Sequence, residues 1–335
     1  MAKGAPISDV REISNLAYGF IGSKVLFSAL NARIFELLAK GPRSLADLEL
    51  ETGIAGNRLE TLLTACTSLG LIERGAEGYR NAPASQQYLV AGSPLYFADY
   101  FRFQIDRQLY PLLVDLDGAL RGRAPASLYG LMANAEEADY FTRAQHAGSL
   151  GPAAVVAKQV LLAGAARLLD VAGGSGAFSI TLCRRFPELR ATVLDFPTVT
   201  PVAQRYITEA GLADRIEVLP GDALQSAWPA EQDAVLLSYL LSAVAGEAIP
   251  RLGRLAYDAL RPGGQLLVHD FFVDDDRQGP RGAALWFMSF LFNPDAVSLT
   301  PGAVSATLEA SGFTDAAVRD VIPGLTRLVI ARKPA

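Results

Sequence analysis

Cysteine and histidine are scarce in this sequence, which has two residues of each among 335. Cys66 and Cys183 are far apart, and each lies in an apolar helical pattern. They are therefore predicted to be buried thiols in a reducing compartment, and not a disulfide. Because no pair of cysteines has zinc-ligand spacing and only two histidines are present, we expect no structural metal site.

Basic clusters and long apolar runs are missing as well. The 30 Lys and Arg residues are outnumbered by 35 Asp and Glu residues, which gives a net charge of −5, and no run is rich in Lys or Arg. Since nucleic acids require a basic face, we expect no nucleic-acid partner. The first 15 residues contain no signal-peptide core, and no uninterrupted apolar run approaches the length of a membrane span. The prediction is a cytoplasmic protein without a membrane partner.

The composition is that of an ordinary globular protein, with 50% hydrophobic and 19% charged residues, and the length allows one large and one smaller domain. In the first third, helical patterns at 13–39, 44–53 and 59–69 precede two short strands in LIERGAEGYR, residues 71–80. This order is typical of a winged helix. Its second helix carries only Arg58 as a basic residue, which favours packing or dimerisation over DNA binding.

The rest of the chain changes pattern once. Residues 95–161 are rich in helix signals and aromatic side chains, most of which we expect in the core and a few in an apolar pocket. From residue 165 onward, short apolar strands alternate with helix-length segments, which predicts a doubly wound parallel sheet. The strand LTRLVIARK, residues 325–333, is typical of an antiparallel hairpin at the edge of such a sheet.

The clearest ligand signal is LLDVAGGSGAFS, residues 168–179, which predicts a strand, a glycine-rich turn and the start of a helix. Gly173, Gly174 and Gly176 let the backbone turn tightly and approach a ligand, and the helix N-terminus offers free N–H groups. Glycine spacing alone would also suit a tight turn that binds nothing.

Three acids at the carboxyl ends of strands favour a bound ligand. Asp170 precedes the glycines and suits a cationic amino group, whereas Asp195 at the end of the second strand suits ribose hydroxyls. Asp222 ends the third strand, where an adenine would lie. The glycine spacing differs from the G-x-G-x-x-G pattern of dinucleotide sites.

Together with the upstream winged helix, four motifs resemble the S-adenosylmethionine-dependent small-molecule O-methyltransferases of the caffeic-acid and hydroxyindole type. They are DVAGGSG, LDFP, GDAL and RPGGQLLVHDFF, in the family's order over nearly the whole chain. The resemblance implies an α/β fold, in which an N-terminal, all-helical winged-helix dimerisation domain (with the two short strands as its wing) precedes a doubly wound Rossmann-like methyltransferase domain. It also implies a homodimer, a small-molecule substrate and S-adenosylmethionine as cofactor.

We expect residues 1–90 to form the winged-helix-like dimerisation domain, 91–150 a helical linker and substrate lid, and 151–335 the S-adenosylmethionine-binding Rossmann-like domain. The resemblance also implies roles for individual residues. Those expected to bind the cofactor are Asp170, Gly173, Gly174, Gly176, Asp195, Phe196, Asp222, Ala223 and Ser238. Those expected to bind substrate are Phe141, Gln145, Phe287 and Asn293.

The sequence departs from the family at the catalytic base. In the family a His-Asp-Trp triplet follows the fourth strand, and its His deprotonates the substrate hydroxyl. Here the triplet is replaced by Ser242, Ala243 and Val244. A serine hydroxyl is too weakly basic for that step unless another base activates it. Asp270 corresponds to the Glu that orients the family's His, and a second family Glu, near Ser298, is lost.

The missing base leaves several hypotheses open. In the one we prefer, a small aromatic or heteroaromatic metabolite is methylated at a carbon, a nitrogen or an acidic hydroxyl, because alignment with the methyl group suffices. In another, His146 or His269 replaces the base, and Tyr239 and Ser242 orient the substrate. The catalytic candidates are therefore His146, Tyr239, Ser242 and Asp270.

Two further hypotheses keep the fold but change the activity. One uses the bound cofactor for a non-methylating cyclisation, decarboxylation or hydroxylation, because one fold can host many reactions. The other is a non-catalytic winged-helix regulator. The three retained acids argue against the regulator, since an inactive chain would not need a complete cofactor site.

Overall fold

The computed structural model describes residues 6–123, 129–293 and 295–335, which form two compact units divided between Arg107 and Gln108. The three-part division of the chain at residues 90 and 150 stays a prediction. Position 150 lies inside α8 (Ala135–Gln159), a continuous helix of 25 residues.

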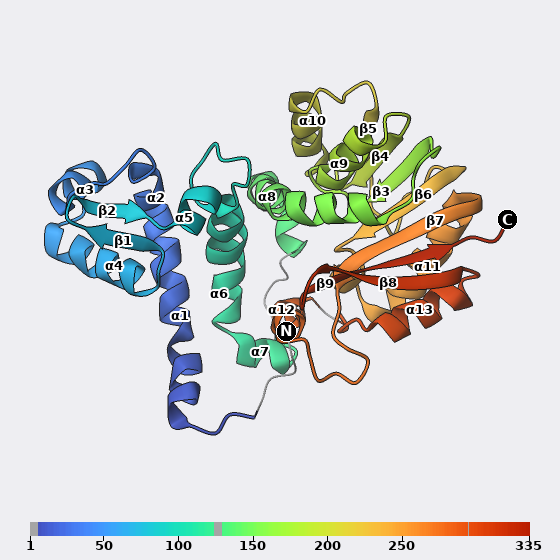
Figure 1. Cartoon of the computed structure of the whole chain (residues 1–335). Helices are drawn as coiled ribbons and strands as arrows, with labels where there is room; N and C mark the ends of the chain where they lie inside the picture. The colour runs from blue at the N-terminus through green and yellow to red at the C-terminus, as the bar shows by residue number, and fades with distance from the viewer. Residues whose placement is uncertain (1–5, 124–128, 294) are drawn as a thin grey trace. The chain divides into compact units, whose positions relative to one another are not determined.

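The smaller unit ends at Arg107 and is mainly helical (Figure 1). Its helices are α1 (Val10–Asn31), α2 (Ile34–Leu37), α3 (Leu45–Thr52), α4 (Gly56–Ser68) and α5 (Pro83–Tyr88), followed by the π-helix η1 (Tyr100–Leu109), in which the division falls. The strands β1 (Ile72–Gly75) and β2 (Gly78–Asn81) pair antiparallel and form the predicted wing. Cys66 of α4 is a buried free thiol, as predicted, and so is Cys183 in the larger unit.

Local sequence signals explain most of these bounds. Ser44 and Asp47 form the expected capping box of α3, and Gly53 ends that helix in the left-handed conformation, with φ 67°. The single helix expected over 13–39 is wrong. Arg33 adopts a left-handed φ of 58°, which breaks the helix, and α2 begins after it.

Helix α1 presents a long apolar surface. Ile13, Leu16, Phe20 and Ile21 are each more than half exposed. By length and composition, α1 is also the one helix in the described part of the chain that could cross a membrane, and 17% of its most apolar window is buried. Because Lys24 and several polar residues interrupt α1, it is not an uninterrupted apolar run, and the finding does not contradict the expectation that no such run approaches membrane-spanning length. The same composition fits a helix that packs against another protein surface.

The larger unit, Gln108–Ala335, holds a seven-stranded mixed sheet with helices on both faces (Figure 1). Its strands are β3 (Arg167–Val171), β4 (Arg190–Asp195), β5 (Ile216–Pro220), β6 (Gln232–Ser238), β7 (Leu260–Phe271), β8 (Thr314–Ile322) and β9 (Thr326–Arg332). Its α-helices are α6 (Tyr110–Leu113), α7 (Leu116–Leu120), α8, α9 (Ala177–Arg185), α10 (Thr200–Glu209), α11 (Ile249–Ala259), α12 (Arg281–Trp286) and α13 (Pro301–Ala310). Short 3-10 helices are η2 (Tyr129–Ala133), η3 (Leu241–Ala243), η4 (Gly246–Ala248) and η5 (Phe287–Phe292).

The strand order is β5-β4-β3-β6-β7-β9-β8, and the first five strands are parallel, which confirms the doubly wound sheet. Strand β9 pairs antiparallel with both β7 and β8, which confirms the predicted edge hairpin. From β3, successive strands are added on one side as far as β5, and the chain then crosses to the other side of β3, where β6 and β7 lie. The strand order therefore reverses between β3 and β6. In open α/β sheets, ligands bind outside the carboxyl ends of the strands beside such a reversal.

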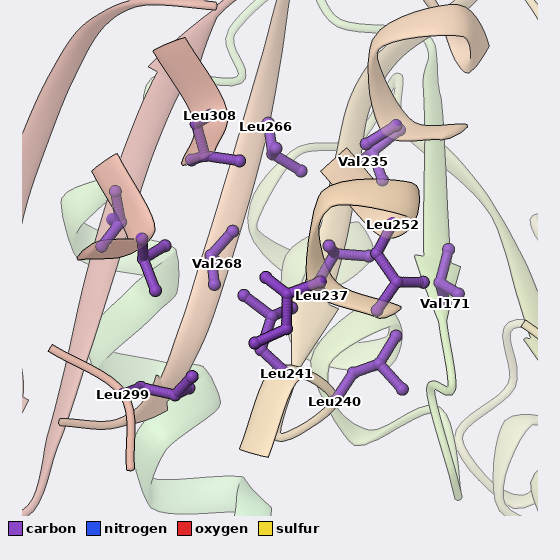
Figure 2. Packing of buried hydrophobic residues seen from close by; sticks show 14 of the residues in the cluster. Val171, Val235, Leu237, Leu240, Leu241, Leu252, Leu266, Val268, Leu299 and Leu308 are labelled. Atoms are coloured by element: carbon purple, nitrogen blue, oxygen red, sulfur yellow. The ribbon is translucent and has the colours of Figure 1, made fainter. Parts of the chain in front are cut away.

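Alternate residues of the central strands pack on opposite faces of the sheet. In β6, Val235 and Leu237 join Leu252 of α11 in one buried cluster, which Figure 2 shows. Ala234 and Leu236 belong to a second cluster, which includes side chains of α9 and α10. Because helices cover both faces, the strands appear in the sequence as continuous apolar runs.

Candidate active site

A cavity of about 260 Å³ lies at the carboxyl ends of β3, β4, β5 and β6, beside the reversal in strand order. Most of the predicted cofactor-binding residues line it, namely Asp170, Gly173, Gly174, Asp195, Phe196, Asp222, Ala223 and Ser238. Gly176 is not in the lining, because it is the N-cap of α9 just behind the turn. Helix α8 contributes Phe141, Thr142, Gln145 and Ser149 to the wall.

The glycine-rich turn after β3 passes very close to a carboxylate. At Gly173 a Cβ atom would lie 2.7 Å from Asp170 Cγ, so a larger residue would displace that side chain. Ala172, just before the glycines, also lines the cavity and adopts a left-handed φ of 54°. That conformation costs a residue with a Cβ about 1 kcal/mol, and such strain is concentrated at ligand sites.

Asp170 is fully buried beneath this turn. Its Oδ2 accepts a hydrogen bond from Ser179 Oγ at 2.7 Å, and Oδ1 has no hydrogen-bond partner among the described residues. Burial raises the pKa of Asp170 to about 7, and the nearby charge of Asp195 adds to this effect. A buried carboxylate oxygen without a partner is suited to a cationic ligand group.

The other two acids are held by backbone groups. Asp195 Oδ2 accepts from Gly174 N, and its Oδ1 accepts from Phe196 N, both at 2.7 Å. Burial raises the pKa of Asp195 to about 6. Asp222 Oδ1 accepts from Leu224 N, and its Oδ2 accepts from the side-chain amide of Gln225, both at 2.8 Å. Each carboxylate oxygen has two lone pairs, so both side chains can still accept hydrogen bonds from a ligand.

The residues of the cavity fit S-adenosylmethionine, the cofactor that the resemblance implies. Asp170 Oδ1 suits its ammonium group, and the remaining lone pairs of Asp195 and Asp222 suit ribose hydroxyls and an adenine amino group. The close approach at Gly173 lets backbone N–H groups face the ligand.

Two of the predicted catalytic residues are bonded to each other behind the cavity. Ser242 and Asp270 are fully buried, and Ser242 Oγ donates to Asp270 Oδ1 at 2.6 Å. Asp270 also accepts from the backbone N–H groups of Ser242, at 3.1 Å, and Phe271, at 2.8 Å. Burial raises the pKa of Asp270 to about 6. Neither side chain belongs to the cavity lining, so the structure does not place them against a substrate.

The two histidines also lie outside the lining. His146 Nδ1 is 2.8 Å from Ser175 Oγ, and burial lowers the pKa of His146 to about 4. His269 is fully buried, with Nδ1 2.9 Å from Ser238 Oγ and Nε2 3.1 Å from Thr326 Oγ1. Burial lowers its pKa to about 3. Both imidazoles are therefore neutral at physiological pH.

Tyr239 is the one predicted catalytic residue that lines the cavity. It follows β6 with a left-handed φ of 56°, and its N–H donates to His269 O at 2.8 Å. Its ring packs edge-on against the imidazole of His269, with centroids 4.6 Å apart, and against Phe271. The strained backbone at the end of β6 thus turns this aromatic side chain toward the site.

The predicted substrate residues fall into different places. Phe141 and Gln145 line the cavity. Phe287 does not line the cavity, because it is buried in the core and packs against Phe290. Its role in substrate binding stays a prediction. Asn293 lines a second hollow of about 650 Å³, where its side-chain amide donates to Ala243 O. This hollow shares Ala243, Val244 and Leu224 with the cavity.

Sequence reasoning missed two lining residues of α8. Thr142 is 1% exposed, and its hydroxyl has no hydrogen-bond partner among the described residues. Ser149 lies one helical turn beyond Gln145 on the same side of the helix. The signal was available, because residues spaced by 3, 4 or 7 positions from Gln145 share its helix face.

Models of known families match both parts of the chain. One described as an O-methyltransferase domain covers residues 123–314, and one described as an O-methyltransferase dimerisation domain covers residues 14–91. Among solved structures, human N-acetylserotonin methyltransferase in complex with S-adenosylmethionine superposes with a TM-score of 0.89. It is 25% identical, and the match covers 99% of this chain and 100% of the human one.

Two bacterial relatives differ in the atom named as acceptor. The 3-hydroxy-5-methyl-1-naphthoate 3-O-methyltransferase of Streptomyces sahachiroi is 32% identical over 327 residues, 96% of this chain and 94% of the relative. The L-tyrosine C(3)-methyltransferase of Streptomyces lavendulae is 27% identical over 293 residues, 84% of this chain and 80% of the relative.

Proposed function

Because this chain belongs to the S-adenosylmethionine-dependent O-methyltransferase family, we propose that it methylates a small aromatic acceptor at a carbon, a nitrogen or an acidic hydroxyl without an imidazole base. Membership of the family and the use of S-adenosylmethionine confirm what the sequence motifs predicted. The acceptor atom is open within this family, since one relative is named for transfer to oxygen and another for transfer to carbon.

The set of titratable side chains at the cavity supports this proposal. Among the described residues of the lining, these are Asp170, Asp195, Asp222 and Tyr239. The three acids suit the cofactor. A tyrosine phenol, with an ordinary pKa near 10, is a poor proton acceptor at neutral pH. Asp170 and Asp195, with pKa values of about 7 and about 6, are as basic as an imidazole, but in this proposal both bind the cofactor. The described lining then leaves no basic group free to take a proton from the acceptor.

Alignment of the acceptor atom with the methyl group can accelerate the reaction even though the catalytic base is missing. S-adenosylmethionine, when bound, provides a methyl group on a sulfonium that is open to in-line attack. Asp170 and Asp195 would hold the amino and ribose ends, which fixes the direction from which the acceptor must approach. Apolar side chains such as Met132, Phe141 and Leu240 line the same cavity and would exclude water around the reacting atoms.

Acceptor choice tests this proposal. At pH 8, 4-nitrophenol is largely ionised and 1,3-dihydroxynaphthalene has an electron-rich ring carbon, whereas 2-naphthol keeps its proton. We expect methylation of the first two compounds to be at least about tenfold faster than methylation of 2-naphthol, because only 2-naphthol requires a base. Mass spectrometry of the products would measure the three rates. If 2-naphthol reacted fastest, a base would be present and the proposal would be wrong.

We also propose that the protein is a homodimer held through the smaller unit. The dimerisation-domain model covers residues 14–91, which include most of α1. The apolar side chains of α1 that are more than half exposed, such as Leu16 and Phe20, would be buried by a second copy. A cytoplasmic location stays a prediction.

Charges on α1 should break this dimer. Each of Leu16 and Phe20 contributes about 1.5–3 kcal/mol when fully buried, so Leu16→Asp/Phe20→Asp should weaken association by at least about tenfold. Light scattering after gel filtration would show the loss as a halved mass. Leu50→Asp is the matched control, because Leu50 is an apolar residue of α3 that is 86% exposed and lies outside α1. A double variant that keeps the dimer mass would rule out this interface.

A further inference from the structure

His146 joins three elements around the cofactor cavity. It lies on α8, and its Nδ1 is 2.8 Å from the Oγ atom of Ser175 in the glycine-rich turn. Its ring stacks on Tyr206 of α10, with centroids 3.7 Å apart and planes 7° from parallel. Ser175 itself lines the cavity and is 3% exposed. The imidazole thus connects α8, the turn and α10.

The turn needs such contacts, because its own residues restrict it little. Glycine populates positive and negative φ about equally, so Gly173, Gly174 and Gly176 leave the backbone free to adopt other shapes. One restraint comes from β4, where Asp195 Oδ2 accepts from Gly174 N at 2.7 Å. Within the turn, Gly176 N donates to Gly173 O at 2.9 Å, and just before it Ala172 N donates to Leu194 O at 2.7 Å. The bond between Ser175 and His146 adds a restraint from α8.

The environment of His146 suits an orienting role. Burial lowers the pKa of this histidine to about 4, and the charge of Arg184 contributes in the same direction. A neutral imidazole has one donor and one acceptor nitrogen, so it can bond a hydroxyl without carrying charge into the site. The stacked ring of Tyr206 restricts how the imidazole can rotate.

We propose that His146 is a positioning residue that, through Ser175, holds the glycine-rich turn in the shape that receives the methionine end of the cofactor. This inference rests on the place of the cofactor in the cavity. The same contact ties the turn to α8, whose Phe141 and Gln145 also line the cavity. The cofactor turn and this wall of the cavity are therefore fixed relative to each other.

A double-mutant cycle tests the proposal. His146→Phe keeps an aromatic ring against Tyr206 and removes the hydrogen bond, and Ser175→Ala removes the partner hydroxyl. Calorimetric titration with S-adenosylhomocysteine would measure the affinity of each variant. We expect each single change to weaken binding about tenfold, and the double variant to bind about as weakly as either single one, because both changes break the same contact.

Two outcomes would overturn the proposal. One is a double variant weakened by the product of the single effects, about a hundredfold, which would make the two side chains independent. The other is a pair of single variants that bind as well as the wild type. The titration of the wild type distinguishes a failure of this proposal from a failure of the proposed function. If the wild-type protein does not bind S-adenosylhomocysteine, the proposed function itself is wrong. Tyr206→Leu controls for packing, since it removes the stack and leaves the hydrogen bond in place.

A spectroscopic readout distinguishes positioning from general stability. The chain has only two histidines, so side-chain nitrogen NMR of histidine-labelled protein contains two imidazoles, and His146→Phe assigns them. Addition of S-adenosylhomocysteine should shift the Nδ1 signal of His146 in the wild type, and Ser175→Ala should abolish that shift. A shift of the same size in Ser175→Ala would contradict the proposed connection.

Discussion

Asp170→Asn is expected to weaken the binding of S-adenosylmethionine and S-adenosylhomocysteine by about a hundredfold. The carboxylate of Asp170 is fully buried, and its Oδ1 has no hydrogen-bond partner among the described residues, whereas Oδ2 accepts from Ser179. A cationic amino group at Oδ1 would gain a charge-assisted hydrogen bond worth about 1.5–3 kcal/mol. Asparagine keeps the shape of the side chain and removes its charge. Titration calorimetry measures the loss directly.

The same carboxylate gives binding a pH dependence. Because burial raises the pKa of Asp170 to about 7, the group is partly protonated in the ligand-free protein at neutral pH. An ammonium group prefers the ionised carboxylate, so affinity should rise with pH up to about 7 and then level off, and binding below pH 7 should release a proton. Calorimetry in two buffers of different ionisation enthalpy detects that proton. Asp170→Asn should lose this pH dependence.

Stability should respond to this substitution in the opposite direction. An aspartate in the unfolded chain titrates near 3.8, and Asp170 in the folded protein titrates near 7. Asp170 therefore contributes its full stabilisation of the folded protein below the pKa of the unfolded chain. Between the two pKa values this contribution to the free energy of unfolding falls by about 1.4 kcal/mol per pH unit, and it is lost as pH rises through the pKa of the folded protein. At pH 8 the ligand-free Asp170→Asn variant should have a higher melting temperature than the wild type. Weaker binding together with a raised Tm cannot result from unfolding.

Asp270→Asn is the matched control for this prediction. Asp270 is also a fully buried acid near the end of a strand, and burial raises its pKa to about 6. It bonds Ser242 and lies outside the cavity lining, so its charge has no direct role in holding the cofactor. The control should leave the affinity for S-adenosylhomocysteine unchanged. Equal losses in both variants would mean that the cofactor does not contact Asp170.

The sheet and the cofactor acids could be predicted because their signals are local. Each strand is a short apolar run, and the three acids lie at the carboxyl ends of three of them. Asp170 is the next-to-last residue of β3, Asp195 is the last residue of β4, and Asp222 lies two residues after β5. In a parallel sheet, strand ends of one kind meet at one edge, so the three acids had to approach one another. Gly53 and the Ser44 capping box set helix bounds in the same local way.

The substrate side could not be predicted, because it depends on how side chains far apart in sequence pack. Phe287 lies in an aromatic segment that suits a pocket wall, yet it is buried against Phe290. Ser242 and Asp270 are 28 positions apart, and nothing in either local sequence indicates that they bond each other. The break at Arg33 is also invisible to periodicity, since the apolar pattern continues beyond it.

Ser242→His is expected to raise kcat/KM for a protonated phenol such as 2-naphthol by at least about a hundredfold, because a positioned general base contributes about 10²–10⁴. The orienting group for that base is already present. Asp270 Oδ1, which now accepts from Ser242 Oγ at 2.6 Å, can accept instead from the Nδ1–H of an imidazole. Ser242 is fully buried and outside the cavity lining, so the longer imidazole would have to displace neighbouring side chains to reach the cavity, which Ala243 and Val244 already line. Repacking this buried position should cost about 1–3 kcal/mol of stability.

The pH dependence identifies the source of any gain. A new base should give the rate a rising limb with a pKa near that of imidazole, about 6.5, because only the neutral ring accepts the phenolic proton. The rate with 4-nitrophenol, already ionised at pH 8, should change little. Ser242→Asn is the matched control, since an amide can bond Asp270 but cannot act as a base. An equal acceleration in that control, or no gain in the histidine variant while it binds S-adenosylhomocysteine normally, would mean that proton removal does not limit the wild-type reaction.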